Sequence, residues 1–144
     1  MKVHVELSEE YRTPCAVIYA DAVTEEVQRA MELLGASSVP LAVQREERTF
    51  VLRPEEVFMV RIEGGITAVY TERERFSSRK RLYELMEQLG PGFQQISKQT
   101  AVKLSRVKSV EAEFSGALLL RLKNGLSDYV SRRYQPGFKK ALGL

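Results

Sequence analysis

The sequence has few of the residues that build disulfides and metal centres. Its 144 residues include one cysteine, Cys15, and one histidine, His4. A single cysteine excludes an internal disulfide, so we expect a reducing, cytoplasmic environment. Cys15 follows a proline and precedes an apolar run, which predicts that its thiol is buried and inert. His4 has no neighbour at a metal-ligand spacing, so no metal site is predicted.

Sequence patterns that bind nucleotides or support hydrolytic catalysis are also missing. The chain contains no G-x-x-x-x-G-K-[ST] and no G-x-S-x-G. It has no run of about 18 apolar residues that would cross a membrane. Residues 1–7 lack the apolar core of a signal peptide. We therefore predict a protein that is not an enzyme and needs no cofactor.

Charge is distributed unevenly along the chain. The formal net charge is +3, but residues 1–72 hold 7 Lys and Arg against 13 Asp and Glu. Residues 73–144 hold 15 against 6. This asymmetry predicts a polyanionic partner for the second half. The alternative is that these are solvated surface charges that cluster without a partner.

Residues 1–39 predict a β-β-α extension. Apolar and polar residues alternate over 2–7, and the run AVIYA at 16–20 is apolar, so both segments predict strands. From Thr24 to Leu34 the apolar residues have helical spacing, with Thr24 as the N-cap. The sequence ASSVP at 36–40 is the best candidate for a domain boundary.

Residues 40–144 predict a second domain that is mainly β, within an α+β fold class. Short apolar runs separated by turn signals predict strands over 40–43, 49–52, 57–62, 66–71, 73–76, 93–96, 110–114, 117–122 and 126–130. Asn124-Gly125 is a strong hairpin signal and predicts that the last three strands form a meander. One helix is predicted up to Leu89, with Ser77 or Ser78 as its cap and Arg79 and Lys80 in its first turn.

Basic residues gather in the last third of the chain. Lys98, Lys103 and Arg106 are close in sequence, and Arg132 and Arg133 follow the last predicted strand. If the meander brings Val130 beside the strand at 93–96, the regions of Lys98 and Arg133 flank one edge. Arginine and helix N-termini both bind phosphate, and we expect Ser131 to cap a terminal helix there. The alternative is that these are rim charges of a small β-sandwich.

Two stretches of the chain resemble a known family. They are GFQQISKQTAVKLSRVKSV at 92–110 and LLLRLKNGLSDYVSRRYQPGFKKALG at 118–143. Together they are similar to the LytTR DNA-binding domain of bacterial transcriptional regulators. The resemblance covers about residues 40–144, and the part from Asn124-Gly125 to Tyr134 is the most specific. The preceding β-β-α unit looks like the extension of stand-alone members, which have no receiver domain.

The resemblance implies a fold, a partner and contact residues. It implies an elongated stack of antiparallel sheets with about ten strands and few helices. It also implies sequence-specific binding of double-stranded DNA at paired direct repeats, by loops that enter successive major grooves. Lys98 and Arg133 fall at base-reading positions, and a third family contact falls near 64–67. The residues expected to position the DNA backbone are Arg132, Gln99, Ser131, Lys103 and Arg106, with Arg79 and Lys80 as weaker candidates.

The chain departs from the family pattern at several positions. Ser97, included among the DNA-binding candidates, stands where many members have histidine, and Lys103 stands where asparagine is usual. Gln135-Pro136-Gly137 interrupts what is normally a smoother helix. We expect these departures to change which DNA sequence is read more than whether DNA is bound.

Partners and alternatives follow from the same comparison. The family implies a homodimer at least on DNA, and an inhibitory membrane-protein partner for stand-alone members. The acidic residues 1–39 are a possible dimer or partner contact, or a structural brace on the sheet. The alternative function is a non-enzymatic protein-interaction module with a basic surface. RNA binding is a weaker alternative because the chain lacks an evident exposed aromatic pair for base stacking.

Overall fold

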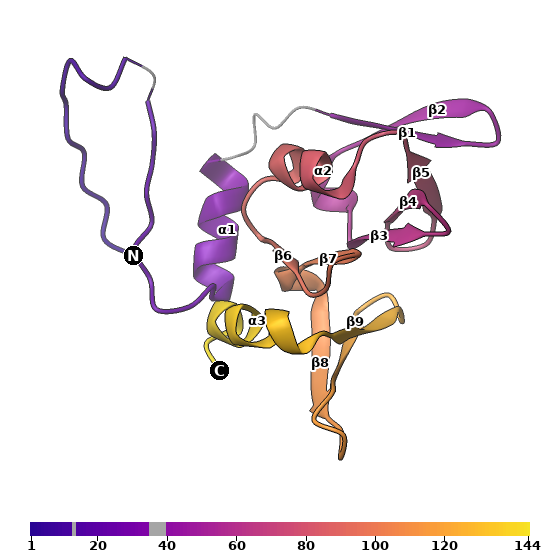
Figure 1. The fold of residues 1–144 in the computed structure, drawn as a ribbon. Coiled ribbons are helices and arrows are strands. Elements are labelled where there is room, and N and C mark those ends of the chain that lie inside the picture. The colour runs from indigo at the N-terminus through magenta and orange to yellow at the C-terminus, as the bar shows by residue number, and fades with distance from the viewer. Residues whose placement is uncertain (13, 35–39) are drawn as a thin grey trace.

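The computed structural model describes residues 1–12, 14–34 and 40–144 (Figure 1). These residues form ten strands and three α-helices. The strands are β1 (Leu41–Arg45), β2 (Arg48–Leu52), β3 (Met59–Glu63), β4 (Ile66–Tyr70), β5 (Arg75–Ser78), β6 (Phe93–Gln95), β7 (Thr100–Lys103), β8 (Val107–Ala112), β9 (Leu118–Leu122) and β10 (Ser127–Val130). The helices are α1 (Glu25–Leu34), α2 (Leu82–Leu89) and α3 (Gln135–Leu142), with 3-10 turns η1 (Pro54–Glu56), η2 (Leu104–Arg106) and η3 (Arg132–Tyr134). The predicted mainly β fold with about ten strands is confirmed.

The strands form two antiparallel sheets. The larger has the order β2-β1-β5-β4-β3-β7-β6, and the smaller has the order β10-β9-β8. The predicted hairpins and the terminal meander are all present. Gly64-Gly65 closes the β3–β4 hairpin with φ values of 57° and 79°, which glycine adopts without cost. Glu46 and Glu47 close β1–β2 with φ values of 50° and 63°, an unusual conformation for residues that carry a Cβ.

Two hydrophobic clusters hold the layers together. On one face of the larger sheet, α2 contributes Leu82, Leu85 and Leu89 to the first cluster. On the other face, the second cluster joins β3 and β7 to the smaller sheet and to α3. Phe138 of α3 is fully buried in this second cluster. The larger sheet is therefore a central layer between α2 and the smaller sheet.

Helix α1 packs beside the edge strand β6 and against α3 (Figure 1). The predicted helix and its cap are confirmed, because Val27 N donates to the Thr24 hydroxyl at 3.3 Å. Gln28 is buried against Gly92, where a Cβ would lie only 2.6 Å from the Gln28 side chain. A bond of 2.9 Å from Val23 N to Ala141 O ties the start of this helix to α3.

The two strands predicted for the N-terminal extension are wrong. Residues 2–7 and 16–20 contain no strand and run in an extended loop that projects from the body (Figure 1). Among the described residues no other layer covers them, and Val5 and Leu7 remain 72% and 93% exposed. Cys15 is exposed rather than buried for the same reason. The candidate boundary at 36–40 lies, except for its proline, outside the described residues.

The starts of two helices also differ from expectation. Ser77 and Ser78 belong to β5, and α2 begins at Leu82, so Arg79 and Lys80 lie in the connection before the helix. The Ser78 hydroxyl accepts a bond from Lys80 N at 3.1 Å, and so closes a turn instead of capping a helix. Helix α3 begins at Gln135, which places Pro136 in its first turn, where proline needs no hydrogen-bond partner.

Candidate nucleic-acid interface

Two connections that are distant in sequence meet at one end of the molecule. The main-chain N–H of Ser131, which follows β10, donates to the carbonyl of Ile96, which follows β6, at 2.9 Å. The Thr100 hydroxyl donates to the Asp128 carboxylate at 2.9 Å. These bonds join the β6–β7 loop (residues 96–99) to the β10–η3 segment (residues 130–133). We call the surface formed by these two segments the two-loop surface.

The β6–β7 loop presents Lys98 at its tip. Lys98 and Gln99 are exposed, whereas Ser97 is half-buried. Gln99 N donates to the Ser97 hydroxyl at 3.2 Å, and the Gln99 carbonyl accepts from Ile62 N of β3 at 2.8 Å. The loop is therefore fixed at its base. Among the described residues, no carboxylate or carbonyl accepts a bond from the Lys98 ammonium.

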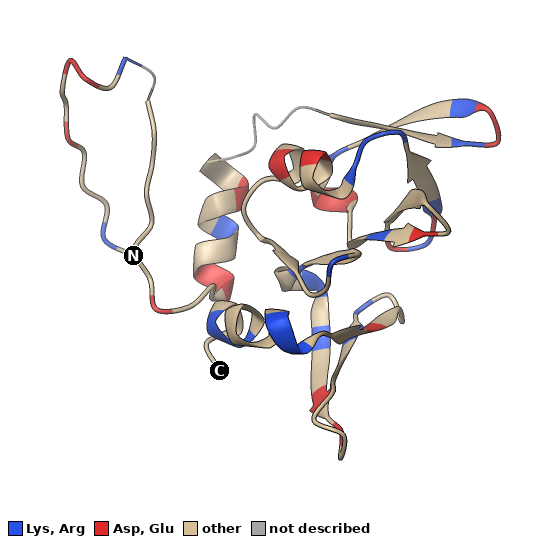
Figure 2. Cartoon of the chain, viewed as in Figure 1, with Lys and Arg blue, Asp and Glu red and all other residues tan. Residues whose placement is uncertain are grey.

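The β10–η3 segment presents Arg132 and Arg133. Both side chains are exposed on η3, and Figure 2 shows basic residues continuing from this segment along α3. Arg132 donates to the Ser115 carbonyl at 3.4 Å, and Arg133 has no acceptor within the described part of the chain. Ser131 flanks η3, but its hydroxyl makes no capping bond. Its carbonyl instead accepts from the main-chain N–H of Tyr134 at 2.9 Å.

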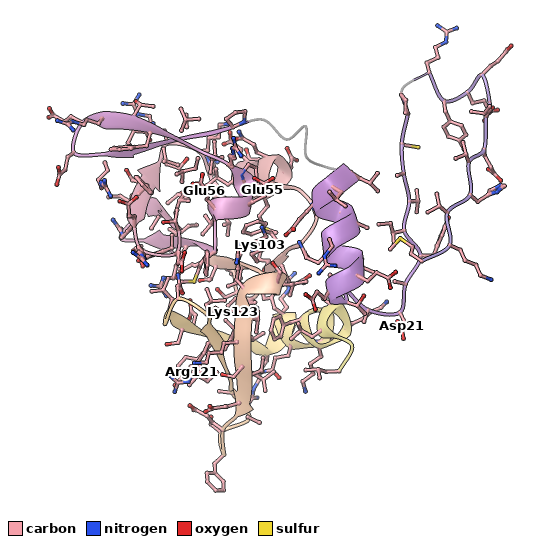
Figure 3. All side chains as sticks on the ribbon, turned by 180° about the vertical axis from the view of Figure 1, so that it is seen from behind. Asp21, Glu55, Glu56, Lys103, Arg121 and Lys123 are labelled. Atoms are coloured by element: carbon pink, nitrogen blue, oxygen red, sulfur yellow. The ribbon has the colours of Figure 1, made fainter. Side chains whose placement is uncertain are left out.

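The structure corrects the roles of Lys103 and Arg106. Lys103 is 3% exposed, and its ammonium pairs with Glu32 of α1 at 3.3 Å and donates to the Glu55 carbonyl at 3.4 Å. Figure 3 views this region from behind and labels Lys103 below Glu55. Arg106 is half-buried, its guanidinium lies over the Phe58 ring at 4.7 Å from the ring centroid, and it also donates to the Glu55 carbonyl. Both residues lie at the far end of β7 from Lys98, so neither faces the two-loop surface.

Arg79 and Lys80 are exposed in the β5–α2 connection, apart from the two-loop surface. They line an open groove of about 700 Å³ together with Arg81, which was not among the sequence candidates. The run of three basic residues at 79–81 was the available sequence signal for Arg81.

Within the described residues, the side chains of His, Cys, Asp and Glu form no cluster suited to holding a metal ion. None of the helices in the described residues is long and apolar enough to cross a membrane.

A polar network braces the two sheets behind the two-loop surface. The Glu63 carboxylate accepts bonds from Arg61 at 2.8 Å, Tyr70 at 2.7 Å and Arg75 at 2.9 Å. Arg61 also reaches Asp128 of β10 at 3.4 Å, which links the larger sheet to the smaller one. Burial raises the pKa of Glu63, but the bonds from Tyr70, Arg75 and Arg61 outweigh it and hold the pKa below its ordinary value. No local sequence pattern points to this network.

We expect Glu63→Gln to destabilise the fold at neutral pH by roughly 1–3 kcal/mol, because it removes a charged hydrogen-bond acceptor. A carboxylate whose pKa is lowered on folding stabilises the protein above its unfolded pKa. That stabilisation is lost as the pH falls through the folded value. The difference in unfolding free energy between wild type and variant should therefore shrink below about pH 4. Urea unfolding across this range measures it, and a pH-independent difference would contradict the assignment.

A small, mainly β domain with exposed arginine and lysine on two joined loops presents a surface suited to a polyanion. The model of the LytTr DNA-binding domain family matches residues 47–143. This match covers more than half of the chain, and the chain therefore belongs to that family.

Several relatives agree with this assignment. The sensory transduction protein LytT of Enterococcus faecalis is 28% identical over 112 residues, which cover 76% of this chain and 46% of that protein. The sensory transduction protein LytR of Staphylococcus saprophyticus is 26% identical over 109 residues, covering 75% and 43%. The chain thus spans less than half the length of these relatives.

A solved structure has the same fold. It is the LytTr DNA-binding domain of a putative methyl-accepting/DNA response regulator from Bacillus cereus, with a TM-score of 0.68 and 20% sequence identity. The match covers 73% of this chain and 97% of the other. The predicted LytTR-like fold is confirmed.

Proposed function

We propose that this protein is a transcriptional regulator that binds double-stranded DNA with sequence specificity through the two-loop surface. The observation that carries the proposal is the 2.9 Å bond from Ser131 N to Ile96 O, which brings the loops of Lys98 and Arg133 together. Family membership supports DNA as the partner. Exposed cations without acceptors in the described chain suit the phosphates and guanine edges of a duplex.

The residues of the two-loop surface divide by chemistry. Arg133 and Lys98 are assigned to base edges in the major groove, where guanine offers two acceptors. Arg132, Gln99, Ser131 and Ser97 are assigned to the sugar-phosphate backbone, which fixes the register of the protein on the duplex. Arg132 reaches only a carbonyl at 3.4 Å, so little free energy is lost when its guanidinium turns to a phosphate.

The proposal extends to assembly and regulation. We propose that residues 40–144 form the DNA-binding domain, that residues 1–39 are an N-terminal extension that packs on it through α1 and offers a dimer or partner contact, and that the protein acts in the cytoplasm. Two copies are proposed to occupy paired direct repeats as a homodimer, and a membrane protein is proposed as inhibitor. These proposals depend on the family resemblance, and the names of two relatives, which are sensory transduction proteins, are consistent with a signal-dependent regulator.

Selection from a pool of random-sequence duplexes tests the proposal. Duplexes enriched by the wild-type protein are titrated beside scrambled versions at salt concentrations from about 0.05 to about 0.3 M. We expect tighter binding of the enriched sequence at every salt concentration, with affinity for both duplexes falling as salt rises. Equal affinity for all duplexes would contradict sequence reading.

Lys98→Ala is expected to weaken binding of the enriched duplex by about 1 kcal/mol, because lysine offers a single point charge to a base edge. The preference over the scrambled duplex should also fall. Lys123→Ala is the matched control, since Lys123 is exposed beside the β9–β10 turn, at the opposite end of the fold. Equal losses for the two variants would remove Lys98 from the interface.

One observation favours a second candidate function, that of a protein-interaction module. Val17 and Tyr19 in the projecting N-terminal loop are 68% and 92% exposed, and a partner would cover them. Replacing both Arg132 and Arg133 by glutamate separates the two functions. DNA binding should be abolished, whereas partner binding through residues 1–39 should be unchanged.

A further inference from the structure

The groove beside α2 lies at the same end of the larger sheet as the two-loop surface. Strand pairing establishes this, since Arg61 of β3 is opposite Thr100 of β7, and Thr67 of β4 is opposite Ser78 of β5. The β6–β7 loop, the β3–β4 turn and the β5–α2 connection therefore all lie at the same end of the strands of the larger sheet. Three strand spacings separate β7 from β5, which corresponds to roughly 14 Å. The major groove of B-DNA is about 12 Å wide.

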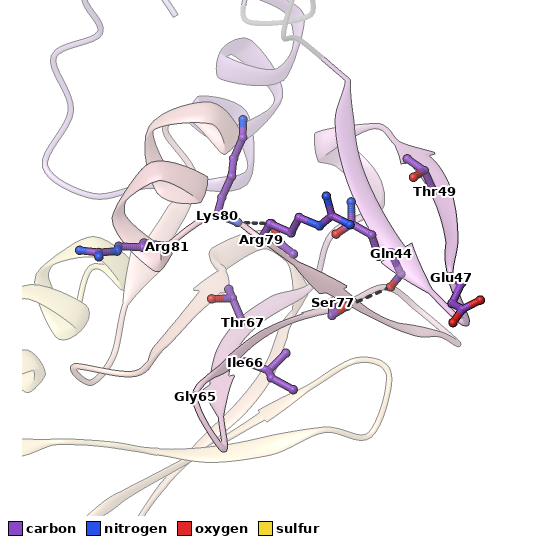
Figure 4. A pocket seen from close by; sticks show the side chains of 11 residues that line it. Gln44, Glu47, Thr49, Gly65, Ile66, Thr67, Ser77, Arg79, Lys80 and Arg81 are labelled. Atoms are coloured by element: carbon purple, nitrogen blue, oxygen red, sulfur yellow. Dashed lines mark hydrogen bonds between the residues drawn. The ribbon is translucent and has the colours of Figure 1, made fainter.

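The groove is polar and basic. Its lining includes Thr49, Thr67 and Gly65, the last of these in the β3–β4 turn. Figure 4 shows Arg79 extending across it toward Gln44, while Lys80 and Arg81 point in other directions. The one carboxylate in its lining is that of Glu47. A strongly anionic, extended ligand fits this charge balance better than an apolar one.

The three cations of the groove differ in how they are held. Lys80 donates to the Gln88 side chain of α2 at 2.5 Å, so its ammonium is directed to the helix. The guanidinium groups of Arg79 and Arg81 are exposed and have no acceptor among the described residues. The neighbouring turn, Gly64 to Thr67, offers no charged side chain, and Thr67 itself is buried. The two guanidinium groups extend in different directions, and in the part of the chain that the structure describes no neighbouring side chain orients them toward a base. They therefore suit phosphate groups of the DNA backbone better than the edge of a base.

We infer that this groove binds the sugar-phosphate backbone of the same duplex, one groove width from the bases read by the two-loop surface. Arg79, which crosses the groove, and Arg81, which belongs to its lining and extends to one side, are the phosphate ligands, and Lys80 takes little part. The inference rests on the proposed function, because it needs a duplex seated on Lys98 and Arg133. It adds a site that strengthens binding to every sequence equally and does not choose between sequences.

The test compares the double variant Arg79→Ala/Arg81→Ala with wild type on an enriched duplex and its scrambled version. The slope of log affinity against log salt concentration is negative, and loss of two phosphate contacts should make it less negative by about 1.8. Near 0.15 M salt this corresponds to a roughly ten- to thirtyfold loss of affinity. The loss should be the same for both duplexes. Lys80→Ala, which removes a charge from the same connection, should change affinity far less.

Duplex length supplies the second arm of the test. An enriched duplex shortened by about five base pairs on one side should lose the groove contact. Wild type should then bind it as weakly as the double variant binds the full duplex, and the double variant should lose nothing further. Shortening each end in turn identifies the side. Unchanged thermal unfolding of the double variant checks that the fold is intact.

The outcomes separate this inference from the proposed function. If wild type prefers the enriched duplex and the double variant keeps wild-type affinity and salt slope, the groove assignment is overturned and the proposed function stands. A double variant that loses affinity only for the enriched duplex would make the groove a base reader and also overturn it. If wild type enriches no sequence, both assignments fail.

Discussion

Arg133→Ala should weaken binding of the enriched duplex by about 1–3 kcal/mol and relax discrimination at one base pair. The side chain is exposed on η3, which is short and fixed by the carbonyl of Ser131. A guanidinium donates two parallel bonds to the O6 and N7 atoms of guanine, and alanine donates none. The loss should therefore depend on sequence, in contrast to the loss of a phosphate contact.

Binding of Arg133→Ala is measured on a set of duplexes that carry each of the four base pairs at each position. One position should lose its preference while the others keep theirs. Arg121→Ala is the matched control, because Arg121 is exposed in β9 and its one ion pair with a described residue is a 3.8 Å pair with Glu111. A uniform loss over all duplexes would assign Arg133 to a phosphate instead of a base.

Phe138→Ala should destabilise the fold by about 3–5 kcal/mol, the usual cost of removing a fully buried aromatic ring. Phe138 shares its hydrophobic cluster with Ile96 and Val130. Those two residues are the first residues of the segments that carry Lys98 and Arg133. A cavity at Phe138 therefore loosens the support of both loops, and DNA affinity should fall although the aromatic ring itself is buried.

Urea unfolding monitored by circular dichroism measures the loss of stability. Phe114→Ala is the matched control, since Phe114 lies fully exposed at the tip of the β8–β9 hairpin and should cost less than about 0.5 kcal/mol. Equal destabilisation by the two variants would show that α3 does not anchor the smaller sheet.

Local sequence patterns predicted most of the strands and turns. Asn124-Gly125 and Gly64-Gly65 each mark a hairpin, because the required backbone conformation is cheap only for such residues. The spacing of Leu82, Leu85 and Leu89 marks α2. The start of α2 was misplaced because Ser78 has two possible local roles, a helix cap or a turn, and pairing of β5 with β4 decides between them. The strands predicted in residues 1–20 are absent, because a strand needs a neighbouring strand to pair with. Alternation of apolar and polar residues does not show whether such a neighbour exists.

The candidate site was predictable only in part. Lys98 and Arg133 are predicted as contact residues from their places in the family pattern, and the predicted meander indicates that their loops lie close together, as the bond from Ser131 N to Ile96 O shows. Lys103 was misassigned because a lysine in a basic stretch is normally solvent-exposed. Its burial depends on Glu32, which lies about seventy residues earlier in the chain. The bonds around Glu63 are of the same long-range kind, and only the assembled sheets bring those groups together.

The ion pair between Lys103 and Glu32 has a consequence for the N-terminal segment. A chain that lacked residues 1–39 would leave the Lys103 ammonium with the Glu55 backbone carbonyl as its remaining partner among the described residues, and a buried cation without a counter-ion is costly. The stability of helix α1 is thus linked to that of the sheet whose edge it packs beside. Any displacement of α1 by the residues that precede it therefore acts on β7, the strand that follows Lys98, through this ion pair in addition to the contacts of Val23 and Gln28.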